Sequence, residues 1–298
     1  SGQGYLPTLR QRVLAPLGMT GTSGGAAARD ELADQAGWHV RDGDQTVAMA
    51  PHHTDNCLGS GGMVVSGLAA LQWLRLHLNG GTVDGRQVLA REALAETHRP
   101  QAVATPGKDL VSLFYPGARM GAYALGWAVS DLEGHPLLCH SGSDHGVTAM
   151  TLLLPRAGIG IAVYANAWTG VVVPLAYALA ATLLGLPPRD WLAYFKAAGA
   201  AIAPTVPNAP EPEGPPSLPL DVYAGTYEHP ADGELCIALD PNGLGGDLRD
   251  GHGMAFTLSP LGGHGFAMHF TQMPARLTMD GWRLDFECRN GSIASARM

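Results

Sequence analysis

Lysine is almost absent from this sequence, whose 298 residues contain only Lys108 and Lys196. Arginine therefore carries most of the positive charge, and the excess of acidic residues gives a formal net charge of -8. No cluster of arginine and lysine interrupts this balance. Because nucleic-acid binding relies on a basic surface, the composition argues against nucleic acid as a main partner.

Cysteine is also scarce, and its spacing carries no metal signature. The four cysteines, with no Cys-x-x-Cys among them, are Cys57, Cys139, Cys236 and Cys288. The pair His52-His53 has Asp55 and Cys57 nearby, but adjacent histidines on a loop rarely turn toward one ion. We therefore expect no metal site and no cofactor. Isolated buried thiols are the favoured interpretation; one or two disulfides stay open, and so does the compartment (periplasmic, secreted or cytoplasmic).

Charge is missing altogether between Arg156 and Arg189. A transmembrane helix needs about 20 consecutive apolar residues, whereas Asn166 and Pro174 interrupt this stretch. It divides instead into a strand over 159–164 and a helix over 172–186, both expected to be buried in a core. We predict no membrane span.

The residues that are present are typical of a folded protein with two domains. Hydrophobic residues make up 46% of the chain and charged residues 15%, which excludes intrinsic disorder. In the first 202 residues, helical spacing predicts an amphipathic helix near the N-terminus, closed by Gly18, and further helices over 67–78 and 90–97. Ser66 is a suitable N-cap for the helix over 67–78, and Asn79-Gly80-Gly81 ends that helix. Weaker strand signals lie around residues 38–40 and 47–49.

A proline-rich segment over 203–220 marks the clearest boundary, and we predict it to be a stiff, extended linker. Residues 221–298 then form a second domain, because short strand candidates follow one another closely: 222–227, 235–239, 246–249, 254–258, 266–270, 276–279, 283–287 and 293–297. Asp280-Gly281 supplies the strongest hairpin turn among them. Closely spaced antiparallel strands predict a small barrel or meander.

The most informative segment is the apolar run that ends in His140-Ser141-Gly142. A second apolar run, Val147 to Leu154, follows after a turn that contains a glycine. This pattern predicts a strand, a hairpin and a partner strand, with His140 at the mouth of the hairpin. Without further context His140 would be a strand-end histidine bonded to a backbone carbonyl. We interpret Asp144 and His145 as solvated turn residues, and Trp127 as core.

Segments spread in order along the first 200 residues give this hairpin a context. They are RVLAPLGMTGT at 12–22, GGMVVS at 61–66 with LNGG at 78–81, YALGW at 123–127, and HSG at 140–142 with Gly146, Pro155 and Asn166 after it. Together they resemble the C-terminal two-thirds of the serine β-lactamase-like and penicillin-binding-protein-like family. The tail from residue 223, YAGTY, resembles the lipocalin-like domain that often follows this catalytic domain.

The resemblance implies an α+β fold for residues 1–202: an incomplete α/β sandwich with an antiparallel sheet, of the β-lactamase and transpeptidase type. A small all-β, barrel-like domain follows over 221–298. The resemblance also implies catalytic roles for His140 and Gly142, and roles in substrate binding or the oxyanion hole for Ser141 and Ser143. His140 would assist proton transfer or hold a carboxylate or carbonyl of the substrate, and the backbone N–H of Ser143 would face the oxyanion.

The departures from the family pattern limit what this chain can do. The family's nucleophile lies in a Ser-x-x-Lys motif, but the residues three positions before Lys108 and Lys196 are Thr105 and Ala193. The family's Tyr-x-Asn motif is missing as well; Tyr164-Ala165-Asn166 has that spelling but follows His140 instead of preceding it. We therefore expect a fragment that begins after both motifs.

Two functional classes stay open. In the first, the chain is the C-terminal piece of an active-site-serine hydrolase or acyltransferase that acts on amide, ester or D-peptide substrates, inactive alone and completed by a missing N-terminal segment, which could be supplied in trans. In the second, it is a non-catalytic binding or scaffolding homologue. A small-molecule or peptide substrate is the expected partner in the first case. A Ser-x-x-Lys motif upstream in the gene would favour the enzyme.

Overall fold

The computed structural model describes residues 2–42, 44–51, 55, 58–104, 121–144, 146–202, 212, 214–230, 233–248, 254–271 and 281–298. Contacts divide the chain into two compact units, Ser1–His39 with Cys57–Pro204 and Val40–Asn56 with Thr205–Met298. None of the described helices is long and apolar enough to cross a membrane.

The helical segments lie mostly in the first unit. They are α1 (Tyr5–Leu9), the π-helical η1 (Arg10–Leu14), α2 (Ala26–Asp30), α3 (Gly67–Leu78), α4 (Arg91–His98), the 3-10 turn η4 (Pro155–Ala157), α5 (Val172–Leu183), α6 (Trp191–Ile202) and the 3-10 turn η5 (Leu220–Tyr223).

The strands up to residue 165 include three short pairs and one large sheet. The short pairs are β1 (Ser23–Gly24) with β4 (Met63–Val64), β2 (Trp38–Asp42) with β3 (Gln45–Met49), and β5 (Thr82–Val83) with β6 (Arg86–Gln87). The large sheet has the order β12-β11-β10-β9-β8-β7. Its strands are β7 (Ala102–Ala104), β8 (Gly121–Tyr123), β9 (Ala128–Leu132), β10 (His135–Asp144), β11 (Val147–Leu154) and β12 (Ile159–Ala165).

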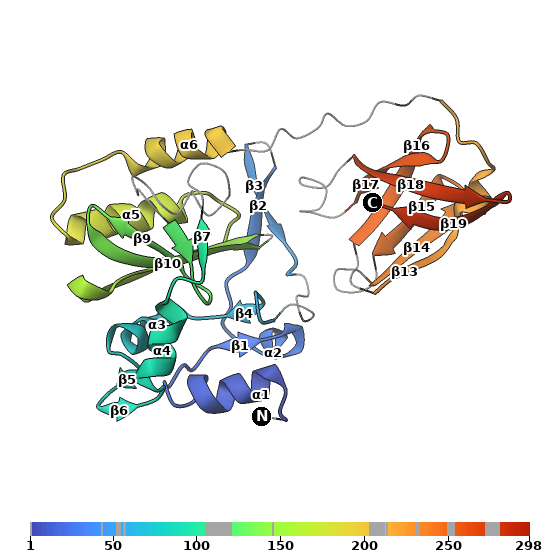
Figure 1. Ribbon diagram of the computed structural model, residues 1–298. Coiled ribbons are helices and arrows are strands. Elements are labelled where there is room, and N and C mark those ends of the chain that lie inside the picture. The colour runs from blue at the N-terminus through green and yellow to red at the C-terminus, as the bar shows by residue number, and fades with distance from the viewer. Residues whose placement is uncertain are drawn as a thin grey trace. The chain divides into compact units, whose positions relative to one another are not determined.

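The large sheet is antiparallel throughout and is covered on both faces. One face packs on α5 and α6, where Cys139, Met150 and Tyr177 belong to one buried cluster. The opposite face packs on α3, where Leu74 meets Leu138 and Leu153. Figure 1 shows α5 and α6 on one side of the sheet and α3 and α4 on the other. The unit is therefore a layered α+β sandwich, as the sequence predicts.

The helix predicted over 67–78 is confirmed, together with its cap. The hydroxyl of Ser66 accepts a hydrogen bond from the backbone N–H of Ala69 at 3.2 Å, which satisfies one of the unpaired donors of the first turn. The helix predicted over 172–186 is confirmed as well, and it ends at Leu183.

The second unit contains one seven-stranded meander in which each strand pairs with the next, a nearly closed, barrel-like sheet (Figure 1). Its strands are β13 (Gly225–His229), β14 (Gly233–Asp240), β15 (Gly243–Leu248), β16 (Met254–Gly262), β17 (Gly265–Phe270), β18 (Trp282–Arg289) and β19 (Ser292–Arg297). Tyr223, Phe266 and Leu284 are fully buried at its centre. The small barrel or meander predicted from the sequence is confirmed.

One strand predicted for the second unit begins later than expected, and another lies outside the described residues. The strand predicted over 222–227 starts later, at Gly225, because Leu220–Tyr223 forms a 3-10 turn that buries the Tyr223 ring. The strand predicted over 276–279 and Asp280 of the predicted turn lie outside the described residues.

The linker predicted over 203–220 stays a prediction, since residues 203–211 and 213 also lie outside the described part. Its final residues are bonded to the second unit: Pro216 bridges to Gly263, and the N–H of Ser217 donates to the Gly263 carbonyl at 2.7 Å.

Candidate active site

The hairpin formed by β10 and β11 carries the residues that the sequence analysis singled out. His140 lies opposite Thr151, and Gly142 lies opposite Ala149. Gly146 has a φ of +90° at the turn, a conformation that glycine adopts without strain. Next to the turn, the buried Thr148 of β11 anchors the hairpin, because its hydroxyl donates a hydrogen bond to the Ala167 carbonyl at 2.9 Å.

Strand alternation separates the four predicted site residues into two pairs. Leu138 packs on the α3 side of the sheet and Cys139 on the α5 side. Because successive side chains point to opposite faces, His140 and Gly142 follow Leu138, whereas Ser141 and Ser143 follow Cys139. The structure thus brings the imidazole and the glycine onto one face, and the two serine side chains onto the other.

The end of β10 has a partner strand on one side only. It pairs with β9 from His135 to Cys139, whereas its pairing with β11 continues to Asp144. Within the part of the chain that the structure describes, residues 140–144 therefore have no strand on the β9 side; we call them the one-sided segment of β10. Exposed strand edges present backbone N–H and C=O groups that an extended ligand can pair with.

A tyrosine that the sequence analysis gave no site role holds the imidazole. The hydroxyl oxygen of Tyr123, at the end of β8, lies 2.9 Å from Nε2 of His140. Desolvation lowers the pKa of His140, and a hydrogen bond from the ring to the backbone of Ser141 opposes that effect only in part. The lowered pKa favours the neutral ring, in which one nitrogen can donate a hydrogen bond and the other can accept one.

A second polar pair lies on the same face as His140. Thr151 is the cross-strand neighbour of His140, and its side chain hydrogen-bonds to Tyr164 on β12. Tyr164 lies opposite Ala149, which in turn lies opposite Gly142. We set Tyr164-Ala165-Asn166 aside as a motif because of its place in the chain, but Tyr164 nevertheless shares the face of the sheet that carries His140.

His39 ties a distant segment to the mouth of the hairpin. Its N–H donates to the Gly146 carbonyl at 3.1 Å, and its carbonyl accepts from the N–H of Trp168 at 2.9 Å. Its ring nitrogen Nδ1 lies 2.9 Å from the carbonyl oxygen of Asn166. The sequence offered only a weak strand signal here, so this contact could not be anticipated.

The remaining candidates add no chemistry to this site. Trp127 is buried, as predicted for a core residue. His52, His53, Cys57 and His145 lie outside the described residues. Among the residues that are described, no group of three or more His, Cys, Asp or Glu side chains could hold a metal ion. The described cysteines Cys139, Cys236 and Cys288 are all free thiols.

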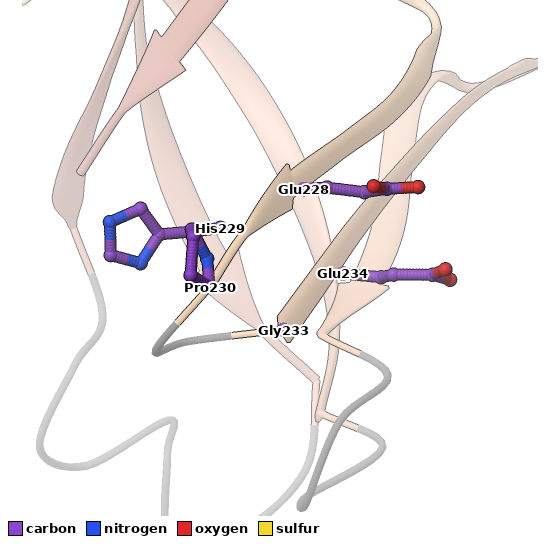
Figure 2. A pocket seen from close by; sticks show the side chains of 5 residues that line it. All are labelled: Glu228, His229, Pro230, Gly233 and Glu234. Carbon is purple, nitrogen blue, oxygen red and sulfur yellow. The ribbon is translucent and has the colours of Figure 1, made fainter.

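A surface hollow on the second unit is lined by Glu228, His229, Pro230, Gly233 and Glu234 (Figure 2). Glu228 and Glu234 lie opposite each other on β13 and β14, and Figure 2 shows their carboxylates pointing the same way. Two like charges side by side do not by themselves make a binding site.

The residues that form the large sheet and the β10–β11 hairpin lie within a segment that matches a known protein family. The Beta-lactamase family matches residues 1–184, and a domain of unknown function, DUF3471, matches residues 209–298. The unguisins hydrolase of Aspergillus campestris is 30% identical over 147 residues, which cover 43% of this chain and 27% of that protein. The corresponding hydrolase of Aspergillus violaceofuscus is 33% identical over 138 residues, or 40% of this chain and 24% of that protein.

The octameric penicillin-binding protein homologue from Pyrococcus abyssi has the same fold, with a TM-score of 0.55 and 16% sequence identity. The superposition covers 98% of this chain and 58% of that protein. This chain therefore spans about a quarter of the length of the curated relatives and little more than half of the solved one. Through residues 1–184, the chain belongs to the beta-lactamase family.

Proposed function

We propose that this chain supplies the β10 wall of the active site of a serine hydrolase or acyltransferase, which cleaves an amide or D-peptide bond through an acyl-enzyme. The observation that carries the proposal is the 2.9 Å contact between the Tyr123 hydroxyl and Nε2 of His140, the first residue of the one-sided segment of β10. The relatives that are named hydrolases support the same class of reaction.

In this family the reaction uses the serine of a Ser-x-x-Lys motif as nucleophile. A serine hydroxyl would attack the substrate carbonyl, its proton would pass through a base to the leaving amine, and water would then hydrolyse the acyl-serine ester. No Ser-x-x-Lys occurs in the sequence, so the serine and its lysine would come from polypeptide outside this chain.

Each of the four predicted site residues has its own role in the proposed reaction. A neutral His140 suits the transfer of a proton or a hydrogen bond to a carbonyl, and is less suited to binding a carboxylate. An added Cβ at Gly142 would meet no atom within 4 Å among the described residues beyond its two chain neighbours, so packing against those residues does not require a glycine there. Gly142 would leave room for the substrate backbone. Ser141 and Ser143, whose side chains face α5, would act through their backbone groups.

The proposal is tested by labelling the full product of the reading frame and the 298-residue chain with a serine-reactive fluorophosphonate. We expect the full product to be labelled at one serine and the 298-residue chain to stay unlabelled. In the full product, His140→Ala should lower kcat by about 10²–10⁴-fold, the usual contribution of a proton-transfer group. His135→Ala, at the other end of β10, is the matched control and should leave kcat unchanged.

A non-catalytic binding module is the second candidate, and the absence of Ser-x-x-Lys favours it. It would take the lead if the full product also carried no reactive serine, while an amide or D-peptide ligand still bound and protected the β10 backbone from hydrogen exchange.

A further inference from the structure

Tyr123, which contacts His140, is held through its backbone by the segment that follows α4. The N–H of Gln101 donates to the Tyr123 carbonyl at 2.9 Å, and Ala102 of β7 lies opposite Tyr123 in the sheet. Gln101 comes three residues after His98, the last residue of α4. The end of α4 therefore leads into the backbone contact that holds Tyr123.

The turn after Tyr123 provides a second support. The N–H of Ala124 donates to the carbonyl of Trp127 at 2.7 Å. Trp127 is buried and packs in one cluster with Leu138, two residues before His140 on β10. The position of Trp127 therefore sets that of Ala124, the chain neighbour of Tyr123.

Both supports meet at a pair of histidines between α3 and α4, two helices that lie side by side (Figure 1). Nδ1 of His77 lies 2.8 Å from Nε2 of His98. The Trp127 ring meets the His77 and His98 rings edge-on, with centroid distances of 5.0 and 6.1 Å. The pair therefore contacts Trp127 directly, and His98 ends the helix that leads to Gln101.

Stability alone does not account for a polar pair at this position. Burying a polar atom without a partner costs free energy, and Nε2 of His77 is buried with no hydrogen-bond partner among the described residues. Two apolar side chains would fill the same space without that cost. A hydrogen bond, however, is directional, and a buried one selects a single arrangement of the groups it joins. The pair therefore fixes His98 relative to α3 more narrowly than apolar packing would.

We infer that His77 and His98 are positioning residues for the candidate site. Their hydrogen bond fixes the end of α4 and the ring of Trp127. These two supports in turn place the Tyr123 hydroxyl at Nε2 of His140. The kinetic consequences rest on the proposed function, whereas the placement of Tyr123 does not.

The test uses the full product of the reading frame, with isotopically labelled histidine for nitrogen NMR. We expect the double variant His77→Leu with His98→Leu to shift the resonance of Nε2 of His140 as far as Tyr123→Phe does, because both lose the Tyr123 contact. If the double variant does not fold, His98→Leu alone takes its place, with the same expected shift.

Two further variants separate the hydrogen bond from general loosening of α4. His98→Gln should keep the parent resonance, since its amide N–H can donate to Nδ1 of His77. Thr97→Val is the matched control. It removes a side-chain hydrogen bond within α4 without changing the histidine pair, and it should also keep the parent resonance.

The same variants predict a pattern in the kinetics. Tyr123→Phe is expected to lower kcat about tenfold, and the double variant should lower kcat by a similar factor with little change in KM. The two changes together should lower kcat no further than either alone, because residues that act through one contact are not additive. His98→Gln should keep the kcat of the parent protein.

A parent-like His140 resonance in a double variant that thermal unfolding shows to be folded would overturn the inference. So would a shift caused by Thr97→Val, or a His98→Gln variant that behaves like the double variant, because the hydrogen bond would then not be the cause. Effects on kcat that multiply with that of Tyr123→Phe would overturn it as well. The resonance can be measured whether or not the protein is an active hydrolase, so a failure here is distinguishable from a failure of the proposed function.

Discussion

Nδ1 of His77 lies 2.8 Å from Nε2 of His98, and the two rings stack with their centroids 5.0 Å apart. Trp73 and Trp127 meet the His77 ring edge-on, at centroid distances of 4.4 and 5.0 Å. The other nitrogen of His77, Nε2, is buried and has no hydrogen-bond partner among the residues that the structure describes. This histidine pair therefore joins α3 to α4 through a site that is built for neutral rings.

The pair predicts a loss of stability in acid. Burial, with a smaller contribution from His98, lowers the pKa of His77 to about 3 from an ordinary value of 6.5. The unfolded chain therefore binds an extra proton between these values. The contribution of neutral His77 to the free energy of unfolding is therefore fully present above pH 6.5. It falls by about 1.4 kcal/mol per pH unit as the pH drops from 6.5 toward 3.

Urea unfolding measured from pH 7.5 to pH 4 tests this prediction. His77→Phe should flatten the pH dependence, because the group that takes up the proton on unfolding is gone. His135→Gln, on β10 and outside the pair, is the control and should keep the slope of the parent chain. An unchanged slope in His77→Phe would show that other groups cause the acid sensitivity.

Tyr123→Phe should act on the reaction and not on folding. The change removes the hydroxyl that lies 2.9 Å from Nε2 of His140. We expect the free energy of unfolding to change by less than about 1 kcal/mol, in the range of a single hydrogen bond. In the full product, kcat should fall about tenfold with little change in KM. If Tyr123→Phe and the parent protein had equal kcat values, Tyr123 would have no role in the reaction.

Gly246→Ala should damage the second unit severely. A Cβ at Gly246 on β15 would collide with the backbone carbonyl oxygen of Cys236 on the adjacent strand β14. The strands would have to separate, which we expect to cost about 3 kcal/mol or more. Gly225→Ala is a matched control, since the nearest atoms to its Cβ among the described residues are those of the Tyr227 side chain, at 3.8 Å or more. Thermal unfolding of both variants measures the difference.

Cys139 should be inert in the folded protein. Its burial raises the pKa of the thiol to about 12, despite a hydrogen bond with Tyr177. Because the thiolate is the reactive form, iodoacetamide at pH 8 should leave Cys139 unmodified and should modify it only after denaturation. Cys288, which is half-buried and free, should react at least partly in the native state. Mass spectrometry of the digested protein distinguishes the two sites, and native labelling of Cys139 would contradict the burial.

Structural features that depend on residues close together in the sequence were predictable. The helix over 67–78 follows from the Ser66 cap, from apolar spacing and from the stop at Asn79. The buried face of that helix was less accessible to such reasoning. Leu68 is exposed by 78% although it fits the apolar spacing, and Ala69 is buried in its place, because the partner elements decide which face is covered.

The candidate site was predictable only in its central strand. His140 and Gly142 could be found because they occupy one short run with a recognisable hairpin after it. Tyr123, which is two strands away from β10 in the sheet order, reaches His140 past the first residue of β9. His39 reaches Gly146 from more than 100 residues away. Such contacts depend on the order of strands in the sheet, which local patterns do not specify.

The one-sided segment of β10 has a consequence for selectivity. A ligand that extends along residues 140–144 would pair with the strand edge through its own backbone amide groups. Methylation of a single amide nitrogen in the ligand would remove one of these pairings, whereas selection among ligands would depend on the side-chain surroundings of the strand.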